Sequence, residues 1–163
     1  MFGSAPTDTK PTQAFPFQRK EYFLTNAERS FFGVLQGAVG QQYLIFAKVR
    51  LADLVFIPKG TFSAVRPEGV EGWTAESPRA WRSHMNRIQS KHIDFVLCDR
   101  QSVRPLVAIE LDDSSHQSAD RQARDTVVEG VLEAAGLPLF RIAVRTGYNP
   151  ADLTRAINEA IGS

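Results

Sequence analysis

Residues 107–112 constrain the fold more than any other part of the chain, because two kinds of side chain alternate along them. Apolar Val107, Ile109 and Leu111 alternate with Ala108, Glu110 and Asp112. Successive side chains of a strand point to opposite faces, so the segment predicts a strand with one apolar face and one face carrying two carboxylates. Stray acids usually lie on exposed edge strands, whereas this segment is typical of a sheet interior. We therefore treat its two acids as candidate functional residues.

The remaining patterns predict an α/β fold with a central mixed sheet of about four strands flanked by helices. Strands are expected at residues 42–51, 93–98, 107–112 and 137–144, and residues 52–57 are a candidate for a further strand. Helices are expected from the capping box at Thr25 to Gly40, from Pro78 to Ile88, over 120–135 before Gly136, and after Asn149. The strand–helix–strand order over 107–144 favours a right-handed parallel crossover.

Length and composition favour a single domain in a reducing compartment. The 163 residues suit one domain, which we expect over residues 21–163, after a flexible tail at 1–20 and with an insert at about 58–90. Cys98 is the one cysteine, which excludes a disulfide framework, and its apolar strand favours a core position over a nucleophile. The chain has no apolar run of membrane-spanning length and no signal-peptide core. These features predict a cytoplasmic protein without membrane contact.

Three acidic residues form the candidate catalytic and metal site. Asp94 lies on the strand expected to pair with residues 107–112 in a hairpin, and alternation groups it with Val96 and Cys98, opposite Ile93, Phe95 and Leu97. Asp94, Glu110 and Asp112 would then share one sheet face, where their mutual repulsion calls for a cation. Mg²⁺ or Mn²⁺ suits such hard oxygen ligands and can activate phosphodiester hydrolysis. The alternative is that each carboxylate is only solvated on an open face.

Nearby residues offer further candidates, each with a simpler explanation. His116 follows the acidic strand in a loop and can move protons near pH 7, or it is only a solvated loop residue. Arg124 can stabilise phosphate charge from the following helix, or it lies on a solvated helix face. Glu28 can point toward the same site, but its capping-box position favours a local role, and one rotamer would not easily serve both.

The helix expected after Pro78 carries unbalanced positive charge. The basic residues are Arg79, Arg82, Arg87 and Lys91, accompanied by His84 and Trp81. They suit contacts with nucleic-acid phosphates, and Trp81 suits base stacking. The alternative is a solvated amphipathic helix with Trp81 in the core, which we favour slightly for Trp81 itself. The net charge of +1 does not indicate a partner, so only this local clustering argues for nucleic acid.

Several segments resemble a bacterial family known as domain of unknown function 2726, over about residues 20–155. They are residues 24–29 (Leu-Thr-Asn-Ala-Glu-Arg), 92–99 (His-Ile-Asp-Phe-Val-Leu-Cys-Asp), 109–116 (Ile-Glu-Leu-Asp-Asp-Ser-Ser-His), 124–125 and 135–142. The family is itself similar to the PD-(D/E)XK nuclease superfamily, especially its very-short-patch-repair branch. The resemblance implies a restriction endonuclease-like core, in which Asp94 and Glu110 match the magnesium-binding Asp and Glu, and hydrolysis of DNA phosphodiester bonds.

The chain departs from that superfamily at one position. Most members have a Lys two residues after the Glu, where this chain has Asp112. The very-short-patch-repair branch also lacks that Lys and uses histidines, which implies a compensating role for His116; Lys91 or Arg124 is the alternative source of positive charge. The first hypothesis is a magnesium-dependent nuclease acting on DNA. The others are a catalytically inactive nucleic-acid-binding module of the same fold and a protein-interaction domain.

Overall fold

The computed structural model describes residues 15–58, 61, 78–112 and 119–162, with side chains for all of these except Pro78 and residues 119–124. Its elements, in chain order, are α1 (Asn26–Val39), β1 (Tyr43–Arg50), α2 (Leu51–Leu54), α3 (Pro78–Ile88), β2 (His92–Asp99), β3 (Pro105–Asp112), α4 (Ala119–Ala134), β4 (Leu139–Ala143) and α5 (Pro150–Gly162). None of the helices in these ranges has the length and apolar character needed to cross a bilayer.

The four strands form one mixed sheet in the order β1-β2-β3-β4. Both β1 and β3 pair with β2 in antiparallel fashion, and β3 pairs with β4 in parallel through the α4 crossover. The acidic strand β3 is therefore an interior strand, as its sequence predicts. The expected α/β fold with a four-stranded mixed sheet is confirmed.

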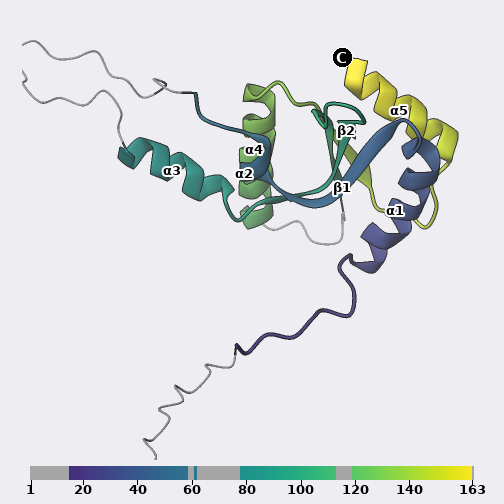
Figure 1. Cartoon of the computed structure of the whole chain (residues 1–163), viewed down its shortest axis with the longest axis horizontal. Coiled ribbons are helices and arrows are strands. Elements are labelled where there is room, and N and C mark those ends of the chain that lie inside the picture. Colours follow the sequence, from purple (N-terminus) through teal and green to yellow (C-terminus); the bar gives the residue numbers. More distant parts are fainter. Residues whose placement is uncertain (1–14, 59–60, 62–77, 113–118, 163) are drawn as a thin grey trace, which may run out of the picture.

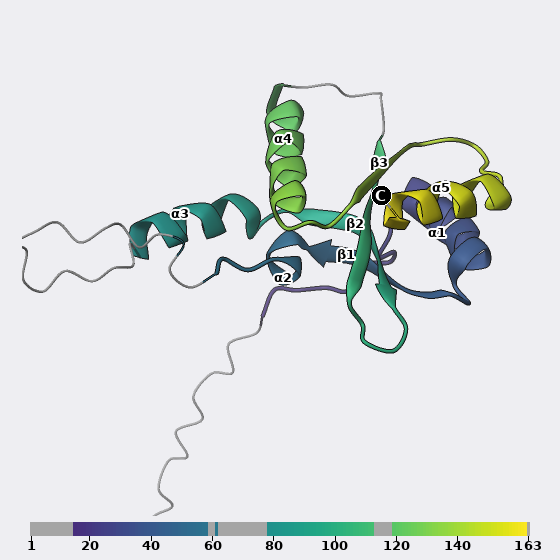
Figure 2. The same cartoon turned by 90° about the horizontal axis from the view of Figure 1, so that it is seen from above.

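Helices cover both faces of this sheet (Figures 1 and 2), and one apolar cluster lies on each face. The cluster under α1 and α5 contains Phe31, Phe95 and Ile157. The cluster on the other face, under α2, α3 and α4, contains Leu51, Ile93 and Leu132. A strand interior to two such layers must be apolar on both faces, so any charged residue within it requires a partner.

Cys98 lies in the second cluster, as expected for a core residue. Its side chain is buried, and burial raises the pKa of the thiol. A protonated thiol is a weak nucleophile, so this cysteine acts as a small apolar residue.

Helix ends follow the capping signals of the sequence. Thr25 and Glu28 form the predicted capping box at the start of α1. After the C-terminal end of α4, Gly136 adopts φ +65°. Its N–H donates to Glu133 O, and the N–H of Leu137 donates to Leu132 O. These two bonds are the pattern of a Schellman motif, which explains why glycine follows this helix.

Two expectations about residues 52–57 and Trp81 are wrong. The chain leaves β1 at Leu51 and forms the short helix α2 instead of a further strand, with an ion pair of 2.7 Å between Arg50 Nη2 and Asp53 Oδ1 across its first turn. Trp81 is 49% exposed and does not belong to the core, because α3 packs through Ile88 and Met85.

Candidate functional site

The candidate site lies at one end of the sheet, where β1 ends, β2 begins and β3 ends. Lys48, Asp94 and Glu110 occupy these positions on three neighbouring strands, and the first turn of α1 brings Glu28 against them. The site therefore combines residues that are more than sixty positions apart in the sequence.

The alternation of side chains changes phase at this end of β1 and β2. Ile93 packs in the cluster under α4, whereas Phe95 and Leu97 pack under α1 and α5, so the expected grouping of these three residues on one face is wrong. On β1, Lys48 has φ +54° and sits between Ala47, which pairs with Phe95, and Val49, which pairs with Ile93. A positive φ is costly for a residue with a side chain, so the contacts of Lys48 must hold it there.

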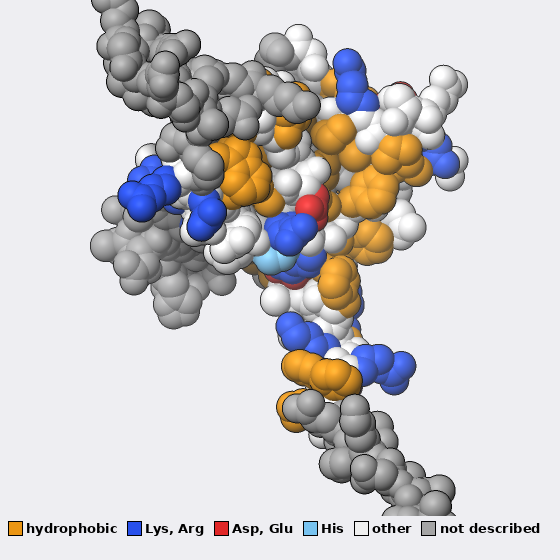
Figure 3. Space-filling view, turned by 60° about the vertical axis from the view of Figure 1, so that its left-hand side comes forward, with side chains coloured by type: hydrophobic (Ala, Val, Ile, Leu, Met, Phe, Trp, Pro, Cys, Tyr) orange, Lys and Arg blue, Asp and Glu red, His pale blue; other side chains and the backbone are white. Residues whose placement is uncertain are grey.

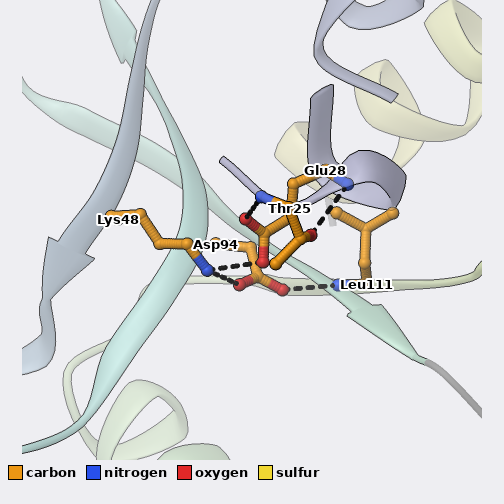
Figure 4. Close-up of polar contacts among 5 residues, drawn as sticks. All are labelled: Thr25, Glu28, Lys48, Asp94 and Leu111. Carbon is orange, nitrogen blue, oxygen red and sulfur yellow. Dashed lines mark hydrogen bonds and ion pairs between the residues drawn. The ribbon is translucent and has the colours of Figure 1, made fainter. Parts of the chain in front are cut away.

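Asp94 is held by two donors, one on each side. Its Oδ2 accepts the backbone N–H of Leu111 at 3.0 Å, and its Oδ1 accepts Lys48 Nζ at 3.0 Å (Figure 4). The ladder between β2 and β3 begins only at the pair Phe95–Ile109. The Asp94 carboxylate thus accepts a backbone N–H of β3 at a position where β2 and β3 are not paired. This hydrogen bond fixes the orientation of the carboxylate.

Glu28 both caps α1 and contacts the candidate site, the two roles between which the sequence analysis chose. Its Oε2 accepts the backbone N–H of Thr25 at 3.0 Å, which completes the capping box, while its Oε1 accepts Lys48 Nζ at 2.5 Å. The expectation that one rotamer cannot serve both is wrong, because each carboxylate oxygen has a different donor.

The charges of Glu28 and Lys48 stabilise each other in a partly desolvated setting. Burial alone raises the pKa of Glu28, but hydrogen bonds from Lys48 and from the Thr25 backbone, with the charge of Lys48, bring that pKa below its usual value. Burial alone lowers the pKa of Lys48, but hydrogen bonds to Glu28 and Asp94 and their charges bring it above its usual value. Both residues are therefore charged throughout the neutral range.

Glu110 and Asp112 lie next to this network on β3. Glu110 is only 7% exposed, and the alternation of β3 directs it away from the α1 cluster that holds Ile109 and Leu111. Asp112 instead pairs with Arg141 of β4, whose Nη1 donates to Asp112 Oδ1 at 2.8 Å. Arg141 also forms ion pairs with two acids of α4: its Nε lies 3.0 Å from Glu129 Oε1, and its Nη2 lies 3.7 Å from Asp125 Oδ1. The ion pair with Arg141 thus gives the Asp112 carboxylate a partner at the end of β3.

The carboxylate oxygens suit Mg²⁺ only in part. Across the described ranges, no three His, Cys, Asp or Glu side chains form a group that could hold a metal ion. Asp94 and Glu110 nevertheless supply hard carboxylate oxygens from adjacent strands, and protein-bound Mg²⁺ commonly has one or two carboxylates, with water and phosphate completing the shell. A magnesium site at Asp94 and Glu110, with Asp112 as a third ligand, therefore remains a prediction.

A pocket of about 530 Å³ opens beside Asp94. Its lining residues are Lys20, Phe23, Lys48, Ser90, Lys91, His92 and Asp94. Basic side chains and a histidine gather near the middle of the face shown in Figure 3. Three lysines and one carboxylate give the pocket an excess of positive charge, which favours an anionic ligand.

The other predicted residues differ in where they lie. Arg79, Arg82 and Arg87 are exposed on α3, and Lys91 follows that helix and lines the pocket beside Asp94. His116 and the side chain of Arg124 lie outside the described residues, so their roles stay predictions. The structure thus connects one of the four basic residues directly to the candidate site.

Lys48 is the functional candidate that the sequence analysis missed. It stands between Ala47 and Val49 in a segment predicted as a strand. A charged residue inside an apolar strand needs a partner, and this holds for Lys48 as it does for Glu110. A charged residue within an apolar strand was therefore the sequence signal that could have identified Lys48.

Comparison with known proteins gives a family but no named relative. The family model described as "Protein of unknown function (DUF2726)" matches residues 20–161, which is nearly the whole chain. No curated protein and no solved structure matches the sequence. On the strength of that match, the chain belongs to the DUF2726 family of proteins of unknown function.

Proposed function

We propose that the chain is a magnesium-dependent nuclease that hydrolyses phosphodiester bonds in DNA, built on a restriction endonuclease-like core. The observation that carries the proposal is the setting of Asp94. Its carboxylate is fixed between the Leu111 amide and the Lys48 ammonium, on the strand next to that of the buried Glu110, and it lines a positively charged pocket.

The reaction adds water across one P–O bond. The water oxygen bonds to phosphorus, the bond to the departing sugar oxygen breaks, and that oxygen takes up a proton while the water gives one up. A magnesium ion held by Asp94 and Glu110 would supply Lewis acidity toward the phosphodiester. The protein must orient the water and balance the charge that develops on the phosphate.

Lys48 is suited to both tasks. An ammonium group has three N–H donors, and Glu28 and Asp94 take two of them. The third can donate to a phosphate oxygen or to the attacking water. In this proposal Lys48 supplies, from β1, the positive charge that most of the resembling superfamily carries at the position of Asp112. We prefer it to Lys91 and Arg124, the alternative sources of that charge in the sequence analysis.

Cleavage of labelled DNA tests the proposal. The native chain should cleave single- or double-stranded DNA when Mg²⁺ or Mn²⁺ is present and should stop when EDTA is added. Glu110→Gln and Asp94→Asn should abolish cleavage, because each removes a charged ligand while keeping the shape of the side chain. Glu159→Gln, which changes an exposed acid on α5, should cleave like the native chain. Equal cleavage by Glu110→Gln and the native chain would refute the proposal.

A second candidate is a nucleic-acid-binding module that does not cut. The exposed arginines of α3 and the half-exposed Trp81 favour it, because they can hold a strand without any metal. It predicts no cleavage under any metal condition, but duplex binding that weakens with salt and weakens further in Arg82→Ala and Arg87→Ala. Unchanged binding in Glu110→Gln would accompany that outcome.

A further inference from the structure

The segment before α1 combines exposed aromatic and basic residues. The aromatic members are Phe15, Phe17, Tyr22 and Phe23, and Arg19 and Lys20 lie between them. All four rings are more than half exposed, with Phe23 at 71%. Figure 3 shows orange and blue side chains along the chain where it leaves the folded body. Exposed apolar rings gathered in one short segment are a typical sign of a binding surface.

The C-terminal end of this segment is fixed at the candidate site. Lys20 and Phe23 line the pocket that contains Lys48, Lys91 and Asp94. On either side of Phe23, Leu24 packs against the α1 cluster, and the Tyr22 ring lies 4.8 Å from the Arg29 guanidinium carbon. These two contacts keep Phe23 at the pocket without burying its ring, so one face of the ring is available to a ligand.

Two nearly parallel rings continue the surface away from the pocket. The rings of Phe15 and Phe17 have centroids 6.5 Å apart and an interplanar angle of 18°. Arg19 and Lys20 follow them toward Phe23. A path of aromatic faces interrupted by cations is the arrangement that binds single strands, because bases stack on the rings while phosphates contact the cations.

We propose that the site accepts an unpaired nucleotide of single-stranded DNA, with its base stacked on Phe23 and its phosphate against Lys20 and Lys91. This inference deepens the proposed function, on which it rests for the assignment of DNA as the ligand. The bases of a duplex are covered by their neighbours and cannot present a face to Phe23. The positive excess of the pocket favours nucleic acid over an apolar peptide, which would gain from the rings alone.

Fluorescence anisotropy with labelled oligothymidine and a labelled duplex, both in EDTA, tests the inference. The native chain should bind the single strand more tightly than the duplex. Phe23→Ala should weaken single-strand binding about tenfold and leave duplex binding within about twofold, since stacking on one ring contributes about a tenfold effect or more. Phe23→Trp should retain the affinity, because it keeps the aromatic face.

Matched controls separate this surface from general effects. Phe56→Ala removes a ring that is 83% exposed but lines a different pocket, between α3 and α4, and should bind like the native chain. Lys20→Ala should weaken single-strand binding and lower its salt dependence by about one ion per site. A Phe23→Ala chain with native single-strand affinity, or a native chain that prefers the duplex or binds neither DNA, would overturn the inference.

The binding test and the cleavage test can each refute one proposal without refuting the other. Metal-dependent cleavage with unchanged binding in Phe23→Ala would keep the nuclease and reject the stacking site. Selective loss of single-strand binding in Phe23→Ala without cleavage by the native chain would keep the stacking site and reject hydrolysis.

Discussion

At the scale of single residues, Lys48 organises the candidate site. Its ammonium lies between two carboxylates that come from different elements, Glu28 of α1 and Asp94 of β2. Without it, both acids would face each other's charge in a partly buried place, where repulsion is stronger than in water. The positive φ of Lys48 is the conformational cost of bringing the ammonium to that position.

Replacing Lys48 by Met should therefore destabilise the fold as well as the site. We expect a loss of roughly 1.5–3 kcal/mol in the free energy of unfolding, the range for hydrogen bonds to charged groups, measured by urea denaturation at neutral pH. Lys48→Arg keeps the charge and should lose less. If Lys48→Met unfolds at the same urea concentration as the native chain, the ion pairs contribute nothing and the proposed organisation of the site is wrong.

The sequence predicted the acids of the site better than their partners. Glu110 and Asp94 stood out because charged residues interrupt apolar strands. Their orientation did not follow from the sequence, because strict alternation fails where Lys48 takes a positive φ and Asp94 leaves the β3 ladder. The shared role of Glu28 depends on the distance between α1 and β1, which only the tertiary packing sets.

At the scale of elements, local signals predicted the parts of the fold that they fully determine. The capping box of α1 and the glycine after α4 are local, and both are found where expected. The short helix α2 was missed, because residues 52–57 are apolar enough for either structure and the chain turns there through a contact between Leu51 N–H and Lys91 O. That contact joins residues forty positions apart and leaves no local pattern.

The two glycines of the α4 region should respond oppositely to the same substitution. Gly136→Ala should cost about 1 kcal/mol or somewhat more, because the residue has φ +65° and a side chain is disfavoured there. Gly130→Ala, inside α4 with open space where the added methyl group would lie, should gain up to about 1 kcal/mol from helix propensity. Thermal unfolding measures both, and a stabilising Gly136→Ala would contradict the Schellman assignment.

At the scale of the whole molecule, the sheet separates two cores and leaves its charged end between them. Apolar clusters cover both faces of β2 and β3, so the fold does not depend on the charged end for its main stability. The site can therefore hold closely spaced charges, and the pH dependence of folding should report them. Two groups with shifted pKa values, Glu28 and Lys48, should act at opposite ends of the pH range.

Glu28 should contribute to the loss of stability in acid, as should Asp53 and Asp99, whose pKa values are also lowered by side-chain hydrogen bonds. The pKa of Glu28 in the fold lies below the ordinary value of 4.5, so its charge stabilises the fold above that pH, and this stabilisation is lost as the pH falls through the folded pKa. For Lys48 the folded pKa lies above 10.5, so its contribution is present below that pH and is lost as the pH rises through the folded pKa. Between these limits both contributions should be constant.

Glu28→Gln isolates the contribution of the Glu28 carboxylate to stability in acid. The native chain should be more stable than the variant by a constant amount at neutral pH, and the difference should shrink below about pH 4.5 as the native carboxylate takes up its proton. Unfolding midpoints of both chains, measured at steps of about one pH unit between pH 3 and pH 8, would show the two stabilities converging in acid. A difference that persists unchanged at pH 3 would mean that Glu28 stabilises α1 as a neutral capping group, and that its charge is not what holds Lys48 at the end of the sheet.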